Sequence, residues 1–392
     1  MDFSINPKFA DLPERAKSIA RDILAPRADE YDQEARFPRE NFEDLAREGF
    51  TALTLPEHLG GRDLYADPEA YSMVLYELAK GCTSTAMLFH MQSSIIHVLT
   101  CILGNPEQSE RYAKAIHEGK IFASHASERT SSLHGKMVMD THAAPSGDGY
   151  VINGRKYFCS MAGEADYCVL WCQLGEDDDL SRSLYLFIAS SGNPGMKMDK
   201  EWDAFSMRPT RSSSMTYENV KIAANDIVGN GGDPIRPDVL PKFGYGYSAV
   251  YLGAGGGAFD WVLDYAKKRK LQPDNVPIAT YPPISRQLGE MKIALDGALL
   301  MVRRAGWLMG AQGAGAAYGA INEAKYAAAE TAAAITEKAI QIAGGAGLMR
   351  HYPLQRFHRD ARAGLIMPPN TEKCLEIAGK TAAEGKAGAL MT

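Results

Sequence analysis

The chain has 392 residues, 45% of them hydrophobic, which is enough to bury large cores over two or three domains. Its formal net charge of -6 and pI near 5.9 argue against general affinity for nucleic acid or an anionic membrane. Six cysteines without a CxxC pair predict free thiols in a reducing cytoplasm and no metal site. We expect no export signal or membrane span, since no run of 18 uninterrupted apolar residues occurs.

The first third of the chain, residues 1–121, is predicted to be helical. Helical spacing of apolar residues recurs there, and two helix starts are well marked. Asp67-Pro68 and Asn105-Pro106 each place a capping side chain before a proline, and Gln108 completes a capping box in the second. The segment from Ser84 to Leu103 is almost wholly apolar apart from a few polar residues, which predicts a buried helix.

Residues 122–232 change in texture and predict a β-domain. The segment from Tyr150 to Phe158 contains two short strand-like runs about Asn153-Gly154, a strong hairpin signal. Further β-rich runs are separated by Gly, Pro and charged turns. Several short strands over about 110 residues suggest a small antiparallel barrel or sandwich.

Residues 233–392 return to a helical pattern after a Gly/Pro-rich linker. Apolar residues from Met291 to Val302 form a regular stripe, and the segment from Ala311 to Ala343 is rich in alanine, which permits close helix packing. Two glycines at Gly344-Gly345 end this segment. They are followed by Tyr352-Pro353 and by a cluster of charges, which is suited to fixing a connector through ionic hydrogen bonds: Arg356, Arg359, Asp360 and Arg362.

The order of these pieces resembles the C-terminal signature of the acyl-CoA dehydrogenase superfamily: Gln-x-x-Gly-Gly from Gln341, Tyr-Pro from Tyr352, Arg-Asp-Ala-Arg from Arg359, then a final loop and helix. The resemblance covers essentially the whole chain. It implies an α+β fold with an N-terminal helical domain, a middle antiparallel β-barrel or sandwich and a C-terminal four-helix bundle.

The same segment departs from the family at the position of its catalytic base. The family's final loop reads Tyr-Glu-Gly-Thr, and its Glu abstracts the substrate α-proton. Here the loop reads Met367-Pro368-Pro369-Asn370, so Pro368 stands at the base position. Some family members carry the base on an earlier helix, and Phe243 occupies that alternative position. Neither side chain can accept a proton.

Several residues match the family's flavin-binding positions, so the resemblance implies FAD as the cofactor. Ser127 and Ser132 lie in the loop that covers the flavin ring and the thioester. Phe158 and Ser160 match an aromatic residue and a hydroxyl that flank the ring, and Asn370 of the final loop is also expected to contact the cofactor.

The resemblance also implies a site shared between chains. Arg269 matches an arginine that reaches the FAD pyrophosphate of a neighbouring subunit, and Gln341 and Gly345 approach the same cofactor from another subunit. The chain is therefore expected to form a homo-oligomer, a homotetramer arranged as a dimer of dimers.

Three functions fit the residues. The first is an FAD oxidoreductase acting on an acyl-CoA or related thioester, with electrons passing to O2 or an electron-transfer protein. His90, on the apolar helix, is then the candidate substitute base, with Tyr245 and Tyr247 as weaker ones. The second is an O2-using flavin monooxygenase or β-elimination lyase of the same fold. The third is an inert partner subunit. The acyl group, electron acceptor and pathway are not encoded in any motif.

Overall fold

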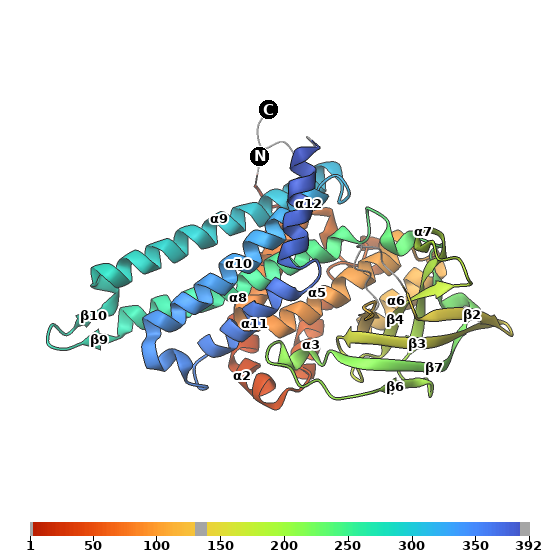
Figure 1. The fold of residues 1–392 in the computed structure, drawn as a ribbon, viewed down its shortest axis with the longest axis horizontal. Helices are drawn as coiled ribbons and strands as arrows, with labels where there is room; N and C mark the ends of the chain where they lie inside the picture. The colour runs from red at the N-terminus through yellow and green to blue at the C-terminus, as the bar shows by residue number, and fades with distance from the viewer. Residues whose placement is uncertain (1–2, 130–138, 385–392) are drawn as a thin grey trace.

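A computed structural model of the protein describes residues 3–129 and 139–384. Figure 1 shows an elongated molecule, with the strands at one end and three long helices running to the other. The order of helices, sheet and helices confirms the expected fold class.

The N-terminal part is helical. Its α-helices are α1 (Leu12–Ile19), α2 (Ala25–Glu34), α3 (Arg39–Arg47), α4 (Pro68–Gly81), α5 (Thr83–His97) and α6 (Pro106–His117). The predicted caps are confirmed: the Asp67 side chain accepts from the Ala70 amide at 3.0 Å, and Asn105 and Gln108 form a capping box.

Helix α5 is the centre of this part, and all its residues are buried. It continues into a π-helical turn, Val98–Ile102. Together they are long and apolar enough to cross a membrane, but 89% of that window is buried inside the fold. The helix therefore has the burial of a core helix, as its all-round apolar sequence predicts.

The middle part is one sheet of eight strands. They are β1 (Phe122–His125), β2 (His142–Ser146), β3 (Gly149–Cys159), β4 (Tyr167–Leu174), β5 (Leu184–Ser190), β6 (Met196–Met198), β7 (Ser213–Ala223) and β8 (Ile227–Val228), with a short helix α7 (Leu180–Ser183) before β5. The order is β6-β7-β3-β2-β4-β5-β8, and β1 pairs with β4. The sheet is mixed rather than antiparallel throughout, because β1 and β2 both run parallel to β4.

The predicted hairpin at Asn153-Gly154 is wrong. Strand β3 runs through both residues, and its pairing with β7 shifts there in a β-bulge. The hairpin lies earlier, where Ser146 of β2 pairs with Gly149 of β3. A Cβ at residue 154 would lie 2.5 Å from the Thr141 Cα, so Gly154 is required by close approach of the backbone and not by a turn.

The C-terminal part is a helical bundle. It contains three long helices, α8 (Pro241–Lys268), α9 (Pro282–Gln312) and α10 (Tyr318–Ala343), and two shorter ones, α11 (Leu354–Ile366) and α12 (Thr371–Ala383). Two-residue strands β9 (Lys270–Leu271) and β10 (Val276–Pro277) pair between α8 and α9. Helix α8 packs on α4, α5 and α10, so it joins the bundle to the N-terminal helices.

Ionic hydrogen bonds join the three parts, as predicted for the charge cluster on α11. The Arg356 Nε lies 2.8 Å from Asp29 Oδ1, and Arg359 pairs with Asp32, which binds α11 to α2. The Asp360 carboxylate accepts from the Met207 amide at 2.7 Å, which fixes the connection before β7. Burial raises the pKa of Asp360 to about 6.

Candidate active site

The segments that carry the two expected base positions approach each other in the fold. Phe243 is on α8, and Pro368 is in the loop between α11 and α12. The sequence neighbours of these two residues lie close together: a Cβ built at Gly244 would lie 3.7 Å from Pro369 Cδ, and equally far from Ile321 Cγ2. Neither position carries a group that can accept a proton.

His90, on α5, packs beside Phe243 of α8. Its Nε2 donates to the Phe243 carbonyl oxygen at 2.9 Å, because a carbonyl can only accept. The other ring nitrogen, Nδ1, then accepts from Tyr71 Oη at 2.8 Å and from Ser94 Oγ at 3.1 Å. Burial lowers the pKa of His90 to about 4, so the ring is neutral near pH 7.

The weaker candidates for a substitute base lie on the same helix, α8. The Tyr247 ring packs edge-on against His90, with the ring centroids 5.0 Å apart. The Tyr245 hydroxyl donates to the Pro68 carbonyl oxygen at 2.9 Å. Burial raises the pKa of both phenols above the ordinary value, which makes them poor acids near neutral pH.

Lys325 of α10 lies beneath the final loop, and sequence reasoning missed it. Its side chain is fully buried, and Nζ donates to the Gly364 carbonyl oxygen at 2.5 Å. Burial lowers its pKa to about 8. A cation at the C-terminal turn of α11 stabilises that helix end. The far end of the loop is fixed by Asn370, whose side chain accepts from the Lys373 amide at 2.8 Å as the N-cap of α12.

The predicted flavin residues of the sheet lie together. The Ser127 carbonyl oxygen accepts from the Tyr157 amide at 2.9 Å, which places the segment after β1 beside the end of β3. Ser160 Oγ lies 2.8 Å from Ser212 Oγ. Phe158, between them in sequence, has a left-handed backbone (φ 55°) and is 67% exposed. Ser132 lies outside the described residues.

A buried ion pair holds the Ser127 segment in place. Lys156 Nζ lies 2.5 Å from Glu128 Oε1, and both side chains are almost completely buried. Burial alone raises the pKa of Glu128, but the charge and hydrogen bond of Lys156 outweigh it and hold that pKa below its usual value. Sequence reasoning missed this pair, because strand lysines are usually exposed.

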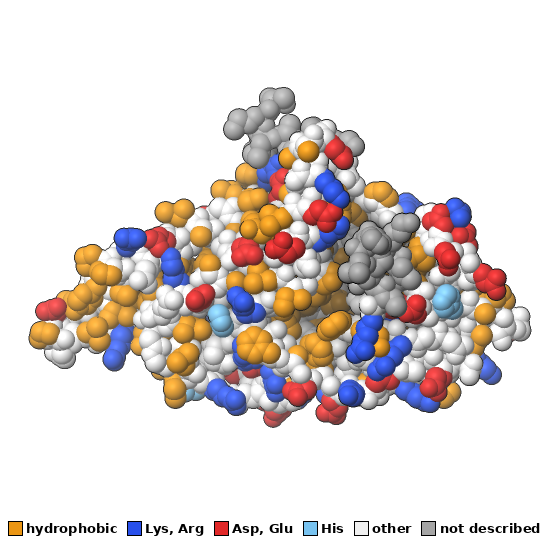
Figure 2. Space-filling view, in the orientation of Figure 1, with side chains coloured by type: hydrophobic (Ala, Val, Ile, Leu, Met, Phe, Trp, Pro, Cys, Tyr) orange, Lys and Arg blue, Asp and Glu red, His pale blue; other side chains and the backbone are white. Residues whose placement is uncertain are grey.

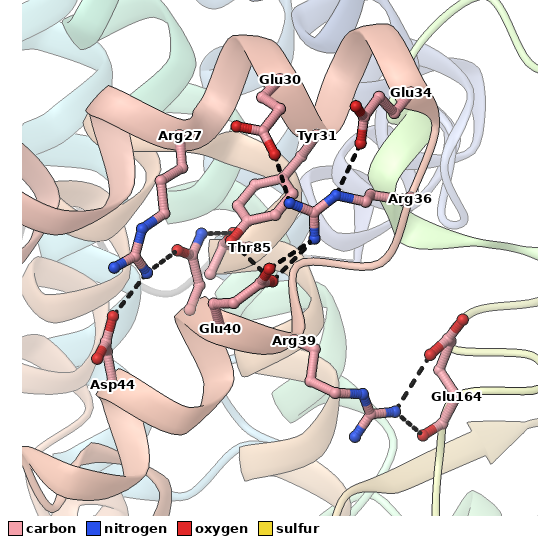
Figure 3. Close-up of polar contacts among 11 residues, drawn as sticks. Arg27, Glu30, Tyr31, Glu34, Arg36, Arg39, Glu40, Asp44, Thr85 and Glu164 are labelled. Carbon is pink, nitrogen blue, oxygen red and sulfur yellow. Dashed lines mark hydrogen bonds and ion pairs between the residues drawn. The ribbon is translucent and has the colours of Figure 1, made fainter.

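A second contact fixes the turn that follows Ser160. Figure 3 shows Arg39, at the start of α3, reaching the loop before β4, where Nη2 donates to the Glu164 carbonyl oxygen at 2.9 Å and to its carboxylate at 3.1 Å. The same view shows α2 and α3 held together, with Arg36 contacting Glu30, Glu34 and Glu40. The N-terminal helices therefore support the segment that carries Phe158 and Ser160.

Three of the other predicted cofactor residues, Arg269, Gln341 and Gly345, lie at or just after the ends of α8 and α10, near the start of α9 (Figure 1). Arg269 ends α8, and Gln341 lines an open pocket of about 360 Å³ between the start of α9 and the end of α10. A Cβ added at Gly345 would meet no described atom within 4 Å, so its backbone is open to a ligand. One chain alone does not bring these residues to Phe158 and Ser160.

Three potential metal ligands gather at the end of α5. Ligand atoms of Asp63, His97 and Cys101 lie within 4.8 Å of one another. Lys242 Nζ lies 3.0 Å from His97 Nε2, so a positive charge already occupies the group. We assign no metal to it. All six cysteines, as predicted, are free thiols.

Helical domains on either side of a sheet form the architecture of a class of flavin oxidoreductases, and the exposed Phe158 ring at the end of β3 offers a face on which a flat cofactor can stack. The chain matches three family models: acyl-CoA dehydrogenase N-terminal domain over residues 7–120, middle domain over 123–220 and C-terminal domain over 245–382. It belongs to the acyl-CoA dehydrogenase family, which confirms the resemblance seen in the sequence.

Curated relatives align over nearly the whole chain. A 3-(aryl)acrylate reductase of Clostridium sporogenes is 30% identical over 93% of this chain and 96% of its own length. The short-chain specific acyl-CoA dehydrogenase of Clostridium acetobutylicum is 26% identical over 97% and 99%. Both relatives are named as oxidoreductases, one as a reductase and one as a dehydrogenase.

Solved structures give the same result for the fold. Butyryl-CoA dehydrogenase of Megasphaera elsdenii superposes with a TM-score of 0.88 at 25% identity, covering 98% of this chain and all of the other. PigA, solved as an FAD complex, superposes with a TM-score of 0.83 at 21% identity, covering 98% and 99%, which shows the fold alone. FAD, the expected cofactor, is the cofactor of this family.

Proposed function

We propose that this chain is an FAD-dependent oxidoreductase that moves a hydride between the flavin and the acyl group of a CoA thioester, without a carboxylate at either usual base position. One observation carries the proposal. The expected flavin positions at the end of β3 carry Phe158 and Ser160, while the two expected base positions carry Phe243 and Pro368, whose side chains cannot take a proton; their sequence neighbours Gly244 and Pro369 lie close together.

The residues present fit FAD. The Phe158 ring is 67% exposed, so its face is accessible for stacking by a flat aromatic cofactor. The backbone of Ser127 is bonded to Tyr157, next to Phe158, and the Ser160 hydroxyl lies 2.8 Å from that of Ser212, so hydroxyl groups are available near Phe158 for the polar edge of a flat ring. When bound, FAD supplies the hydride acceptor or donor.

The proposal includes an oligomer, because Arg269, Gln341 and Gly345 can contact a flavin seated at Phe158 only from another copy of the chain. Helix α9 supports contact between copies. Ile293 and Leu300 project from its outer face, the former 75% exposed, and a Cβ at Gly297 between them would meet no described atom within 4 Å. Hydrophobic side chains are exposed over this end of the bundle in Figure 2. A dimer of dimers remains our expectation for the assembly.

The candidate base His90 stays a prediction, and its geometry favours a different role. Both ring nitrogens are already hydrogen-bonded, one to Tyr71 and the other to the Phe243 carbonyl oxygen. A pKa of about 4 also makes the imidazole a weak base. In this arrangement His90 holds α5 against α8 at Phe243. The substrate α-proton would then leave or arrive without help from a carboxylate at residue 243 or 368.

The test is anaerobic reaction of the FAD-loaded full-length chain with CoA thioesters. Saturated acyl-CoAs are mixed with oxidised enzyme, and unsaturated ones, including an arylacryloyl-CoA, with reduced enzyme; the flavin absorbance is followed in both. We expect stoichiometric FAD and a spectral change with at least one thioester. The arylacryloyl probe is chosen because a relative bears the name arylacrylate reductase.

Other outcomes would favour the alternatives. Protein that binds no FAD would contradict the proposal and support an inert subunit. A monooxygenase would be identified by a different result: no thioester changes the flavin spectrum under anaerobic conditions, but O2 reoxidises the reduced flavin and an oxygen atom appears in a product. Loss of a β-leaving group without net flavin reduction would identify a lyase.

A further inference from the structure

An open pocket of about 420 Å³ lies where the three parts of the chain meet, apart from the residues assigned to FAD above. Its walls come from the end of α2, from residues 204–208 before β7, from residues 348–350 and from α11. Pockets of this volume are in the range of small-molecule sites.

The floor of the pocket carries two arginines in fixed positions. Arg208 donates to the backbone carbonyl oxygens of Asp32 and Ala204, at 2.7 and 3.3 Å. Arg359 pairs with the Asp32 carboxylate and donates to the Phe205 carbonyl oxygen at 3.0 Å. Among the described residues of the wall, Asp32 supplies the only carboxylate, so the positive charge of the pocket is not fully balanced.

The rim adds a third arginine and two exposed apolar side chains. Arg350 is exposed, and within residues 3–129 and 139–384 no hydrogen bond or ion pair of its side chain is found. Phe205 and Leu348, which flank the opening, are 65% and 69% exposed. These two side chains give the pocket an exposed apolar surface on which a flat ring can pack.

We propose that this pocket binds a nucleoside diphosphate. A guanidinium with all its donors available, such as that of Arg350, binds phosphate through two parallel hydrogen bonds. Arg208 and Arg359 add a fixed positive field behind it. The base stacks on Phe205 and packs against Leu348, since aromatic faces accept any nucleobase. The site is separate from the proposed redox reaction and does not depend on it.

The experiment is calorimetric titration of the FAD-loaded full-length protein with ADP, adenosine and inorganic phosphate in turn. We expect ADP to bind at micromolar to submillimolar concentration and more tightly than either fragment. Arg350→Ala should weaken ADP by about tenfold or more, the range expected for one charged hydrogen bond. Phe205→Ala should weaken ADP and adenosine but leave phosphate unchanged.

Arg362→Ala is the matched control, because Arg362 is an exposed arginine of α11 that is not part of the pocket wall. It should bind ADP as the unchanged protein does. The proposal is overturned if no ADP binds at about 1 mM, the upper end of the affinities expected here, if Arg350→Ala and Arg362→Ala bind ADP equally, or if adenosine binds as well as ADP. Equal binding of phosphate and ADP would overturn the stacking of the base.

Discussion

The imidazole Nε2 of His90 lies 2.9 Å from the carbonyl oxygen of Phe243. The candidate substitute base is therefore hydrogen-bonded to the backbone of one of the two expected base positions. This hydrogen bond crosses from α5 to α8 and belongs to a buried group that includes Tyr71 and Ser94. The contact explains why an apolar helix keeps a histidine: the ring satisfies polar groups between two helices.

Acid should destabilise the protein through His90. Its pKa is about 4 when folded and 6.5 in the unfolded chain, so the unfolded state binds more protons between these values. The His90 contribution is therefore fully present above pH 6.5 and is lost as the pH falls toward 4. The difference between the two pKa values corresponds to about 3 kcal/mol. His97 and His125, with pKa values lowered to about 3 and about 4 by burial, add to the effect.

Urea unfolding at about pH 5 and about pH 7, inside and above this window, measures the dependence. His90→Gln should reduce the difference in unfolding free energy between the two pH values, because glutamine does not titrate. His58→Gln, at an exposed site, should leave the difference unchanged. An identical pH dependence in His90→Gln and the unchanged protein would contradict burial of a neutral imidazole.

Gly246 should not tolerate a methyl group, since a Cβ at that position would overlap the His90 ring. We expect Gly246→Ala to lower the free energy of unfolding by about 1–3 kcal/mol through overpacking. Gly244→Ala, two residues earlier on α8, is the control, because its Cβ would make ordinary contacts at 3.7 Å. It should be neutral or stabilise by up to about 1 kcal/mol. Equal effects in thermal or urea unfolding would contradict the close packing of α5 against α8 at this glycine.

Removing the charge of Lys156 should be costly, because it leaves the Glu128 carboxylate buried and unpaired. Lys156→Met is expected to lower the free energy of unfolding by about 3–5 kcal/mol near neutral pH. The same change should reduce FAD occupancy, since Glu128 adjoins Ser127. The double variant Lys156→Met/Glu128→Gln should recover a large part of the loss. Simple additivity of the two single variants in urea unfolding would show that the ion pair is not coupled.

The sequence was most informative where short motifs determine local structure. The caps at Asp67 and Asn105 could be predicted because each depends on residues within four positions of itself. The turn at Asn153-Gly154 was mispredicted. Glycine is needed there because the backbone of Thr141, on a neighbouring segment, approaches too closely for a Cβ, and no local sequence pattern reveals that contact. Lys156 and Lys325 were missed for the same reason: each is buried against a partner distant in sequence.

The flavin site was predicted only in part from the sequence. Phe158 and Ser160 could be proposed as flavin residues because a recognisable string surrounds them, and the structure bonds the neighbouring Tyr157 amide to the Ser127 carbonyl oxygen. The approach of Gly244 to Pro369, which brings the two expected base positions near each other, could not be foreseen, since it depends on how α8 packs against the loop after α11. Arg269 and Gln341 lie at the far end of the bundle, so their part in the site depends on a second chain.

A carboxylate restored at residue 368 should restore the proton transfer that the family's usual mechanism requires. The Pro369 ring lies beside Gly244 of α8, so the loop that carries residue 368 is already close to this helix. We expect Pro368→Glu to raise the rate of flavin reduction by a saturated acyl-CoA by about 100-fold or more, the usual contribution of a positioned general base. It should also promote exchange of the substrate α-proton with solvent deuterium.

Ile366→Glu places the same charge on a side chain that is 75% exposed, and it should leave both rates unchanged. The measurements are anaerobic stopped-flow absorbance and NMR of the recovered thioester. Rapid α-proton exchange in the unchanged protein, equal to that of Pro368→Glu, would show that another residue already serves as the base, and Lys325 beneath the loop would then be the first to substitute.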